Sequence, residues 1–253
     1  MASSIILKSA SELEIMLEAN QIVAGALSML QEHIAPGVNT LQLDKLAESY
    51  ARKNNAEPAF KGYRGFPGSL CVSLNEQVVH GIPARKVVLK EGDILSIDFG
   101  VKYKGYYGDA AVTVPVGIID PDAERLLRVT RESLDKAIEQ VQVGKRIADI
   151  SQAVQGYVEG KGFSVVRQFV GHGIGQHLHE PPEIPNYSRS GRSPKLMAGM
   201  VLAIEPMVNA GTHEVKILGD GWTVVTCDRK LSAHFEHSVA VTENGPLILS
   251  KGI

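Results

Sequence analysis

Helices near the beginning of the chain are indicated by apolar residues that recur three and four positions apart. Over residues 12–32 this spacing predicts an amphipathic helix. Ser9 and Ser11 each stand three residues before a glutamate, so either could open the helix in a capping box. The Ala-Pro-Gly sequence at 35–37 ends it. A second helix is predicted to begin after Thr40 and to end near residues 53–55.

Strands, and then two more helices, are predicted in the middle of the chain. Alternating apolar and polar residues predict strands at 70–74, 94–101 and 106–114, the last two as a hairpin around Gly105. Asp120 as N-cap and Pro121 at the first helical position predict a helix that continues to about Val141. Another helix is predicted from Ile147 to Lys161. Short strands are then predicted at 163–170, 200–208, 215–218, 223–227, 235–242 and 247–249.

The order of these elements indicates the fold class. Two helices occur together with a set of strands in each half of the chain, and strands clustered in this way disfavour a parallel βαβ sheet. We therefore expect a single α+β domain over residues 1–253, built from two pseudo-equivalent halves. Two unrelated small domains are the alternative, which the absence of a linker disfavours.

Composition narrows the function classes. The net charge is −2 and no run of Lys and Arg indicates a nucleic-acid surface. The two cysteines form no CxxC pair, which favours a reducing, cytoplasmic setting. Charges at Lys8 and Glu12 interrupt the N-terminal segment, and no apolar run reaches transmembrane length. We expect a protein that binds neither membranes nor nucleic acids.

Four predicted strands each carry one acidic residue among apolar neighbours: Asp98, Asp109, Glu205 and Glu236. An unpaired buried carboxylate is costly. One such acid could be a turn residue or part of an edge-strand ion pair, but four need a common partner, and few Lys or Arg lie nearby in the sequence. Two divalent cations would balance the four negative charges and could activate a water molecule between them.

The spacing of Asp98 and Asp109 does not decide whether they meet. They stand directly opposite each other, on one sheet face, if Tyr103 and Lys104 form a two-residue loop. Gly105 instead favours a three-residue loop with a bulge, which would place the two acids on opposite faces. A second bulge at Gly108 would restore them to one face. These alternatives remain open at this point.

His172 is the fifth candidate ligand. A lone histidine is more often structural, but His172 stands among Gly171, Gly173 and Gly175, which let backbone and substrate approach closely. Two prolines after His179-Glu180 exclude the helical HExxH zinc motif. Histidine and carboxylates without a cysteine favour Mn²⁺, Fe²⁺ or Co²⁺ over a structural zinc. The other histidines without a candidate role are interpreted as structural: His33, His177, His213, His234 and His237.

Five segments, in this order, resemble the type I methionine aminopeptidase family. They are NEQVVHGIP (75–83), SIDFGVKYKGYYGDAAVT (96–113), GHGIGQHLHEPP (171–182), LAIEPM (202–207) and WTVVTCDRKLSAHFEHSVAVT (222–242). The likeness covers essentially the whole chain. It implies the pita-bread α+β fold, a pseudo-two-fold antiparallel sheet with helices packed on one face. Because the chain begins shortly before its first helix, the compact bacterial type is the nearest likeness.

The resemblance implies a role for each candidate ligand. Asp98 would chelate one metal ion, Asp109 and Glu236 would bridge two, and His172 and Glu205 would complete the second site. The ions would be cobalt, manganese or iron, with zinc or nickel as alternatives. A bridging hydroxide would attack the scissile carbonyl.

The resemblance also implies residues that act on the substrate. Glu205 would be the general base, and His80 and His179 would contact the substrate and its tetrahedral intermediate. Asn75 and Ser232 match positions near a monovalent-cation site in the family.

An apolar pocket for the methionine side chain is implied as well, lined by Tyr63, Phe66, Cys71 and Trp222. Two further pocket positions depart from the commonest bacterial pattern. Phe60 stands where a cysteine is frequent, and Leu178 stands where an aromatic residue is frequent. One ring is gained and one is lost, which bears on fine substrate preference and not on the reaction.

The implied function is removal of the initiator methionine from nascent proteins by a dinuclear-metal-activated hydroxide, favouring a small second residue. The implied setting is a cytoplasmic monomer that meets nascent chains at the ribosome. One alternative is an Xaa-Pro aminopeptidase of the same fold, which the absence of an extra N-terminal domain disfavours. Another is a non-catalytic pita-bread binding protein, which the complete ligand set disfavours.

Overall fold

The helices follow the predicted positions closely. The structure, a computed structural model, describes residues 4–253. Its α-helices and its 3₁₀ turn are α1 (Ala10–His33), α2 (Thr40–Lys53), α3 (Pro121–Ile138), α4 (Ile147–Gly160) and η1 (Tyr63–Gly65). Ser9, and not Ser11, caps α1: its hydroxyl accepts from the Glu12 N–H, and the Glu12 carboxylate accepts from the Ser9 N–H at 2.7 Å. Asp120 caps α3, with Pro121 at its first position as predicted.

A nine-stranded antiparallel sheet forms the centre of the molecule. Its path is β1-β3-β4-β13-β8-β6-β7, with β2 on β3 and β14 on β13. The strands are β1 (Glu57–Pro58), β2 (Cys71–Leu74), β3 (Ile94–Tyr103), β4 (Tyr106–Pro115), β6 (Gly171–Gly173), β7 (Glu180–Ile184), β8 (Val201–Ile204), β13 (Glu236–Thr242) and β14 (Gly245–Ile248). Two small sheets hold β10 (Val215–Ile217), β11 (Val224–Thr226), β5 (Ser164–Val165), β9 (Met207–Asn209) and β12 (Ser232–His234).

Several strands differ from the sequence prediction. The strand predicted at 163–170 is reduced to β5, and the one at 200–208 is split by Pro206 into β8 and β9. The split at Pro206 follows from backbone chemistry, since a proline has no N–H for a sheet ladder. β6 and β7 were not predicted, because glycines and prolines hide the alternation on which a strand prediction depends.

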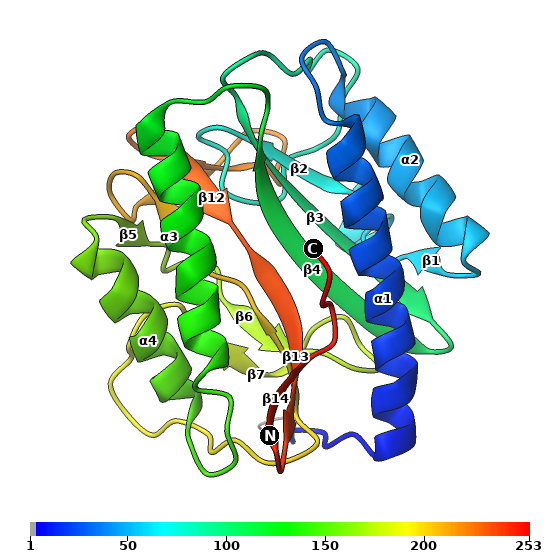
Figure 1. The fold of residues 1–253 in the computed structure, drawn as a ribbon, viewed down its shortest axis with the longest axis vertical. Helices are drawn as coiled ribbons and strands as arrows, with labels where there is room; N and C mark the ends of the chain where they lie inside the picture. The colour runs from blue at the N-terminus through cyan, green and yellow to red at the C-terminus, as the bar shows by residue number, and fades with distance from the viewer. Residues whose placement is uncertain (1–3) are drawn as a thin grey trace.

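The hydrophobic core lies between the helices and one face of the sheet. Figure 1 shows α1 and α2 over one half of the sheet and α3 and α4 over the other half, all on the same side. Leu95, Ile97 and Phe99 of β3 are fully buried in this core together with Leu27 and Leu30 of α1. Because side chains alternate along a strand, the residues between them point to the opposite face. The helix-free face is therefore where the polar residues of β3 and β4 gather.

The helix α1 is the one helix among residues 4–253 that is long and apolar enough to pass a composition test for a membrane span. The core helix of a folded domain can have the same length and composition. In the structure α1 packs on β3 and β4 and carries eight buried residues, as a core helix does. The helix thus has a packing partner inside the fold.

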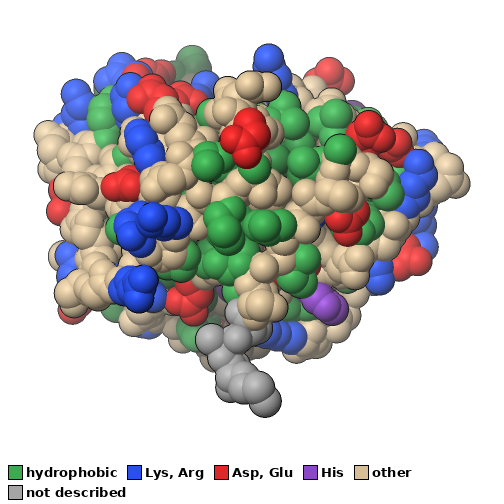
Figure 2. Space-filling view, turned by 90° about the horizontal axis from the view of Figure 1, so that it is seen from below, with side chains coloured by type: hydrophobic (Ala, Val, Ile, Leu, Met, Phe, Trp, Pro, Cys, Tyr) green, Lys and Arg blue, Asp and Glu red, His purple; other side chains and the backbone are tan. Residues whose placement is uncertain are grey.

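The segment ahead of α1 is attached to the body by a buried ion pair. Lys8 Nζ lies 2.6 Å from Glu180 Oε2, and both side chains are at most 3% exposed. The Lys8 N–H also donates to the Gly199 carbonyl at 2.7 Å. The preceding Ile6 and Leu7 are each 47% exposed. Figure 2 shows the lower end of the molecule, where hydrophobic side chains gather between charged ones. Lys8 therefore anchors the segment before α1, in which Ile6 and Leu7 are exposed to solvent.

Candidate metal centre and substrate cavity

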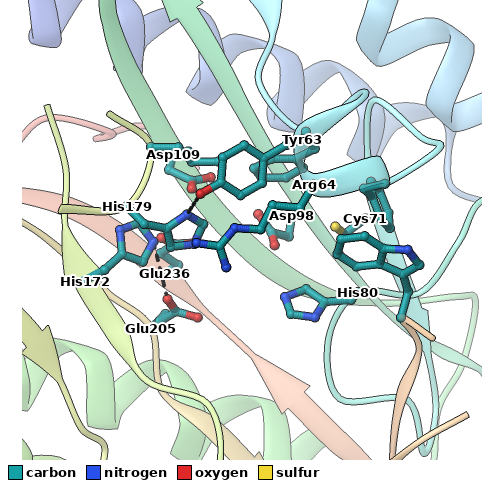
Figure 3. A pocket seen from close by; sticks show the side chains of 14 residues that line it. Tyr63, Arg64, Cys71, His80, Asp98, Asp109, His172, His179, Glu205 and Glu236 are labelled. Carbon is teal, nitrogen blue, oxygen red and sulfur yellow. Dashed lines mark hydrogen bonds and ion pairs between the residues drawn. The ribbon is translucent and has the colours of Figure 1, made fainter. Parts of the chain in front are cut away.

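A cavity of about 150 Å³ lies on the helix-free face of the sheet, where Asp98 of β3 and Asp109 of β4 line it. Figure 3 shows the side chains around it. Its lining residues are Phe60, Tyr63, Arg64, Phe66, Cys71, His80, Asp98, Asp109, His172, Leu178, His179, Glu205, Trp222 and Glu236. Every predicted metal, catalytic and pocket residue is among them. Arg64 is the one lining residue that the sequence analysis did not name.

The turn between β3 and β4 determines how the two aspartates are placed. Tyr103 pairs with Tyr106, which leaves Lys104 and Gly105 as a two-residue loop. Both have positive φ, 48° and 87°, as a type I′ turn requires. Asp98 then pairs with Ala111, two residues from Asp109. Neither loop considered from the sequence is present, and no bulge is needed to bring both acids to one face.

The order of strands in the sheet brings the five candidate ligands together. Asp98 is on β3, Asp109 on β4, Glu236 begins β13, Glu205 directly follows β8, and His172 is on β6. These five strands are consecutive neighbours in the sheet. Residues far apart in the sequence therefore converge, because adjacent strands lie only about 4.8 Å apart.

One oxygen of each inner carboxylate has no hydrogen-bonding partner in the part of the chain that the structure describes. Asp109 Oδ1, Asp98 Oδ1 and Glu236 Oε1 are buried and unpaired among the described residues. Asp109, His172 and Glu236 each place one potential ligand atom within 4.8 Å of the others. Buried, unpaired carboxylates are stable only with a counter-charge or a proton. The oxygen and imidazole donors fit a divalent cation.

The pKa values of these three acids are raised, as expected for buried carboxylates that lack a counter-charge. Burial, opposed in part by His234, raises the pKa of Asp98 to about 7. Burial also raises the pKa values of Asp109 and Glu236 well above their ordinary values, and the neighbouring carboxylates add to the effect. Without a cation the cluster therefore retains protons at pH values where exposed carboxyls are ionised.

Two imidazoles and a phenol form one wall of the cavity. The Tyr63 hydroxyl lies 2.9 Å from His179 Nδ1, and the two rings stack with centroids 5.3 Å apart. The His179 ring lies 4.2 Å, between centroids, from the ring of His172. Burial, followed by the charge of His172, lowers the pKa of His179 to about 4. His179 is therefore neutral at physiological pH.

His80 reaches the cavity from the opposite side (Figure 3). Its φ is 59°, a left-handed conformation that is uncommon for a residue other than glycine. The next residue must be glycine, since a Cβ on Gly81 would come within 1.9 Å of the Val72 carbonyl oxygen. The His80 ring meets Trp222 and Phe169 edge to face, and burial lowers its pKa. A strained backbone thus holds a second neutral imidazole at the cavity.

The family model of metallopeptidase family M24 matches residues 14–243 of this sequence. The chain belongs to metallopeptidase family M24. It is 56% identical over 246 residues to a methionine aminopeptidase of Clostridium perfringens, covering 97% of this chain and 98% of that protein. The crystal structure of a methionine aminopeptidase from Thermotoga maritima has a TM-score of 0.96 at 48% identity, with 98% of this chain and 100% of that chain covered.

A more distant structure shows how far the M24 fold extends. An Xaa-Pro dipeptidase from Bacillus anthracis is 24% identical with a TM-score of 0.78, and 62% of its chain is covered. At that identity the likeness concerns the fold alone. The pita-bread fold class, α+β with an antiparallel sheet and helices on one face, is thereby confirmed.

The apolar side of the M24 cavity contains both positions that depart from the commonest pattern. Phe60 and Leu178 are 8% and 2% exposed and belong to the same buried cluster as Phe66 and Cys71. Trp222 packs edge to face on Phe66, with ring centroids 5.2 Å apart. Burial, and then the charge of Asp98, raises the pKa of the Cys71 thiol, so this sulfur is a neutral wall atom.

Two residues that the sequence analysis did not assign lie at this M24 site. Arg64, with φ 51°, places its guanidinium carbon 5.3 Å from the centroid of the Tyr63 ring. A glycine on each side of Tyr63-Arg64 was the available signal for an exposed turn that reaches the cavity. His234, interpreted as structural, has its Nε2 3.5 Å from Glu205 Oε2. No sequence signal distinguished it from the other histidines.

Asn75 and Ser232 lie side by side, as the M24 resemblance requires of a shared cation site. The Ser232 N–H donates to the Asn75 carbonyl at 2.9 Å. The Ser232 hydroxyl donates to Asn209 Oδ1, and the Asn75 side chain donates to Asp93 Oδ1, both at 2.9 Å. The side chains of Asn75 and Ser232 thus make hydrogen bonds without a cation. Monovalent-cation binding stays a prediction.

Proposed function

We propose that this chain removes the N-terminal methionine from peptides and nascent proteins and favours a small second residue. One observation carries the proposal: five potential metal ligands from five neighbouring strands meet at a cavity that also has an apolar wall. The identity of 56% to a methionine aminopeptidase over nearly the full length supports the same activity. We further propose that residues 1–253 act as one domain, as a cytoplasmic monomer that meets nascent chains at the ribosome.

The unpaired carboxylates fit two divalent cations. Asp98 would hold one ion, Asp109 and Glu236 both ions, and His172 and Glu205 the other. Such ions polarise a carbonyl oxygen and make a water molecule nucleophilic near neutral pH. We propose manganese, iron or cobalt as the ions, because the donors are oxygen and imidazole nitrogen, with zinc or nickel as alternatives.

The remaining polar side chains would orient the substrate and move its proton. Glu205 is at the cavity and has one oxygen 3.7 Å from His172 Nε2, so it is placed to accept a proton from the attacking water. We propose that the Tyr63 hydroxyl donates to Nδ1 of His179, which leaves the proton of this neutral imidazole on Nε2. That N–H would donate to the carbonyl oxygen as negative charge develops there. His80 would contact the substrate from the other side.

The apolar wall would bind the methionine side chain. Phe66 and Trp222 present aromatic edges, and Cys71 contributes a neutral sulfur beside Asp98. A flexible thioether packs well against aromatic rings. Phe60 and Leu178 belong to the same apolar cluster. The aromatic ring gained at Phe60 and the ring lost at Leu178 therefore leave the pocket apolar at both positions.

A peptide panel tests this proposal. Metal-stripped protein and protein restored with Mn²⁺ or Co²⁺ are compared on Met-Ala-Ser, Met-Leu-Ser and Ala-Pro-Ser. We expect metal-dependent release of methionine from Met-Ala-Ser, little release from Met-Leu-Ser, and none of alanine from Ala-Pro-Ser. Cleavage of Ala-Pro-Ser alone would assign the chain to the Xaa-Pro alternative. Cleavage of no peptide by metal-loaded protein would favour a binding protein.

A further inference from the structure

The Glu205 carboxylate lies between two imidazoles. Its Oε1 is 3.7 Å from His172 Nε2, and its Oε2 is 3.5 Å from His234 Nε2. His172 is at the cavity, whereas His234 is 1% exposed and lies behind the carboxylate. The two carboxylate oxygens therefore face different partners, one on the substrate side and one on the interior side.

His234 Nε2 has an unused hydrogen-bonding capacity. Among the described residues this buried nitrogen has no partner within hydrogen-bonding geometry. Leaving a buried polar group unsatisfied costs about 1–3 kcal/mol. Glu205 Oε2 lies 3.5 Å from this nitrogen, a few tenths of an ångström beyond a normal hydrogen bond. Closing that short gap would satisfy both groups.

Hydrogen bonds to a threonine on β4 hold the backbone of His234 in place. The Thr113 hydroxyl accepts from the His234 N–H and donates to the His234 carbonyl, both at 2.8 Å. The Ser96 hydroxyl lies 2.8 Å from Thr113 Oγ1 and can donate to it. All three hydroxyl sites of Thr113 are thereby used. The network ties β12 to β3 and β4, the strands that carry Asp98 and Asp109.

We propose that His234 is a positioning residue for Glu205. Its imidazole, with a proton on Nε2, donates to Oε2 and leaves Oε1 directed toward His172 and the metal centre. This inference rests on the function proposed for Glu205 above. Groups that hydrogen-bond to a metal ligand orient it, and their loss typically lowers metal affinity or activity about 10- to 100-fold. His234 would have this role although it does not line the substrate cavity.

Substitutions separate a donor role from mere packing. His234→Gln keeps a side-chain N–H at similar reach and His234→Leu removes it. The control is His33→Gln, at an exposed position at the end of α1. Each protein is measured for kcat and KM on Met-Ala-Ser with Mn²⁺, and for Mn²⁺ affinity by calorimetry. We expect His234→Leu to lower kcat or Mn²⁺ affinity by about 10-fold or more, with little change in KM. His234→Gln should stay close to the wild type. Equal losses in both variants, or none in His234→Leu, would overturn the proposal.

The wild-type protein provides a test that does not depend on a variant that folds. Long-range ¹⁵N–¹H NMR of the metal-free protein reports which imidazole nitrogen of His234 carries the proton. We expect the Nε2–H tautomer, and an Nδ1–H tautomer would contradict the proposal. If the wild type releases no methionine, the proposed function is wrong, whereas the tautomer and the Mn²⁺ affinities still decide whether His234 supports Glu205.

Discussion

Asp98 and Asp109 face the same side of the β3–β4 hairpin without standing opposite each other. Asp98 pairs with Ala111 and Asp109 with Gly100, so the two acids are diagonal neighbours. A shift of two residues keeps the face, whereas a shift of one would move an acid into the helix-side core. The Lys104-Gly105 turn sets this register at the far end of the hairpin. The geometry of the metal centre therefore depends on a turn that does not touch it.

The turn makes a specific prediction about stability. Gly105 has φ 87° and nothing within 4 Å of where a Cβ would be, so Gly105→Ala introduces backbone strain alone. We expect a loss of about 1 kcal/mol in the free energy of unfolding, with kcat on Met-Ala-Ser unchanged. The matched control is Gly156→Ala in α4, which also has open space but a helical backbone. It should stabilise by about 0.5–1 kcal/mol. Equal effects of the two substitutions in chemical denaturation would contradict this account.

Removal of one buried charge should stabilise the metal-free protein. The pKa of Asp98 is raised to about 7 in the fold, above its unfolded value, because burial disfavours the charged form. The folded state then holds an extra proton between about pH 4 and pH 7, and its stability falls as pH rises through that window. Asp98→Asn abolishes this titration. In urea unfolding at pH 7.5 we expect metal-free Asp98→Asn to be more stable than the wild type by on the order of 2 kcal/mol.

The same substitution should have the opposite effect once metal is present. Mn²⁺ raises the melting temperature of the wild type because it binds only the folded state. Asp98→Asn, with one charged ligand fewer, should gain less from Mn²⁺ and release methionine far more slowly. A variant that is no more stable than the wild type without metal at pH 7.5 would show that the Asp98 carboxylate carries no unfavourable charge.

The buried Lys8–Glu180 pair should be sensitive to loss of either partner. Lys8→Met leaves the Glu180 carboxylate buried without its cation. Breaking a buried ion pair from one side typically costs about 3–5 kcal/mol. The exposed pair Lys104–Glu18, with a nearly equal distance of 2.7 Å, is the control. Lys104→Met should change stability by less than about 1 kcal/mol. Similar changes in melting temperature for the two variants would mean that Glu180 is solvated in solution.

Arg64 should affect the protonation of His179. Burial and the charge of His172 are the main reasons why the pKa of His179 is about 4, and the guanidinium of Arg64 lowers it further. Arg64→Ala should therefore raise this pKa, and Arg52→Ala on α2 should not. NMR titration of His179 in the metal-free protein measures the pKa directly. Because His179 stays neutral at pH 7, kcat there should change little, while the acid limb of the pH profile moves to higher pH. A lower pKa in Arg64→Ala would contradict the proposed arrangement.

The sequence predicted the helices best, because their signals are local. The Ser9–Glu12 capping box and the Asp120-Pro121 start both act within one turn of the residues that they organise. β6 and β7 escaped prediction, since glycine and proline dominate them and pairing with distant strands defines them. The hairpin register also escaped, because Lys104 adopts a positive φ that lysine rarely takes.

Each candidate ligand could be recognised in the sequence, but their convergence at one site could not. An acid among apolar residues is visible in the sequence at Asp98 or Glu236, whereas the strand order that brings them together is a property of the folded sheet. His234 was missed for the same reason. Its neighbours in the sequence are ordinary, and only the fold places its imidazole 3.5 Å from Glu205.

The central claim is that metal held by these ligands removes an N-terminal methionine. Its most direct test titrates Mn²⁺ into metal-stripped wild type and Asp109→Asn, while bound metal and methionine release from Met-Ala-Ser are measured in the same samples. We predict that wild-type activity is absent without metal and rises as up to two ions bind, and that Asp109→Asn loses both metal binding and activity. Full activity in stripped protein, or in Asp109→Asn without bound metal, would contradict the account.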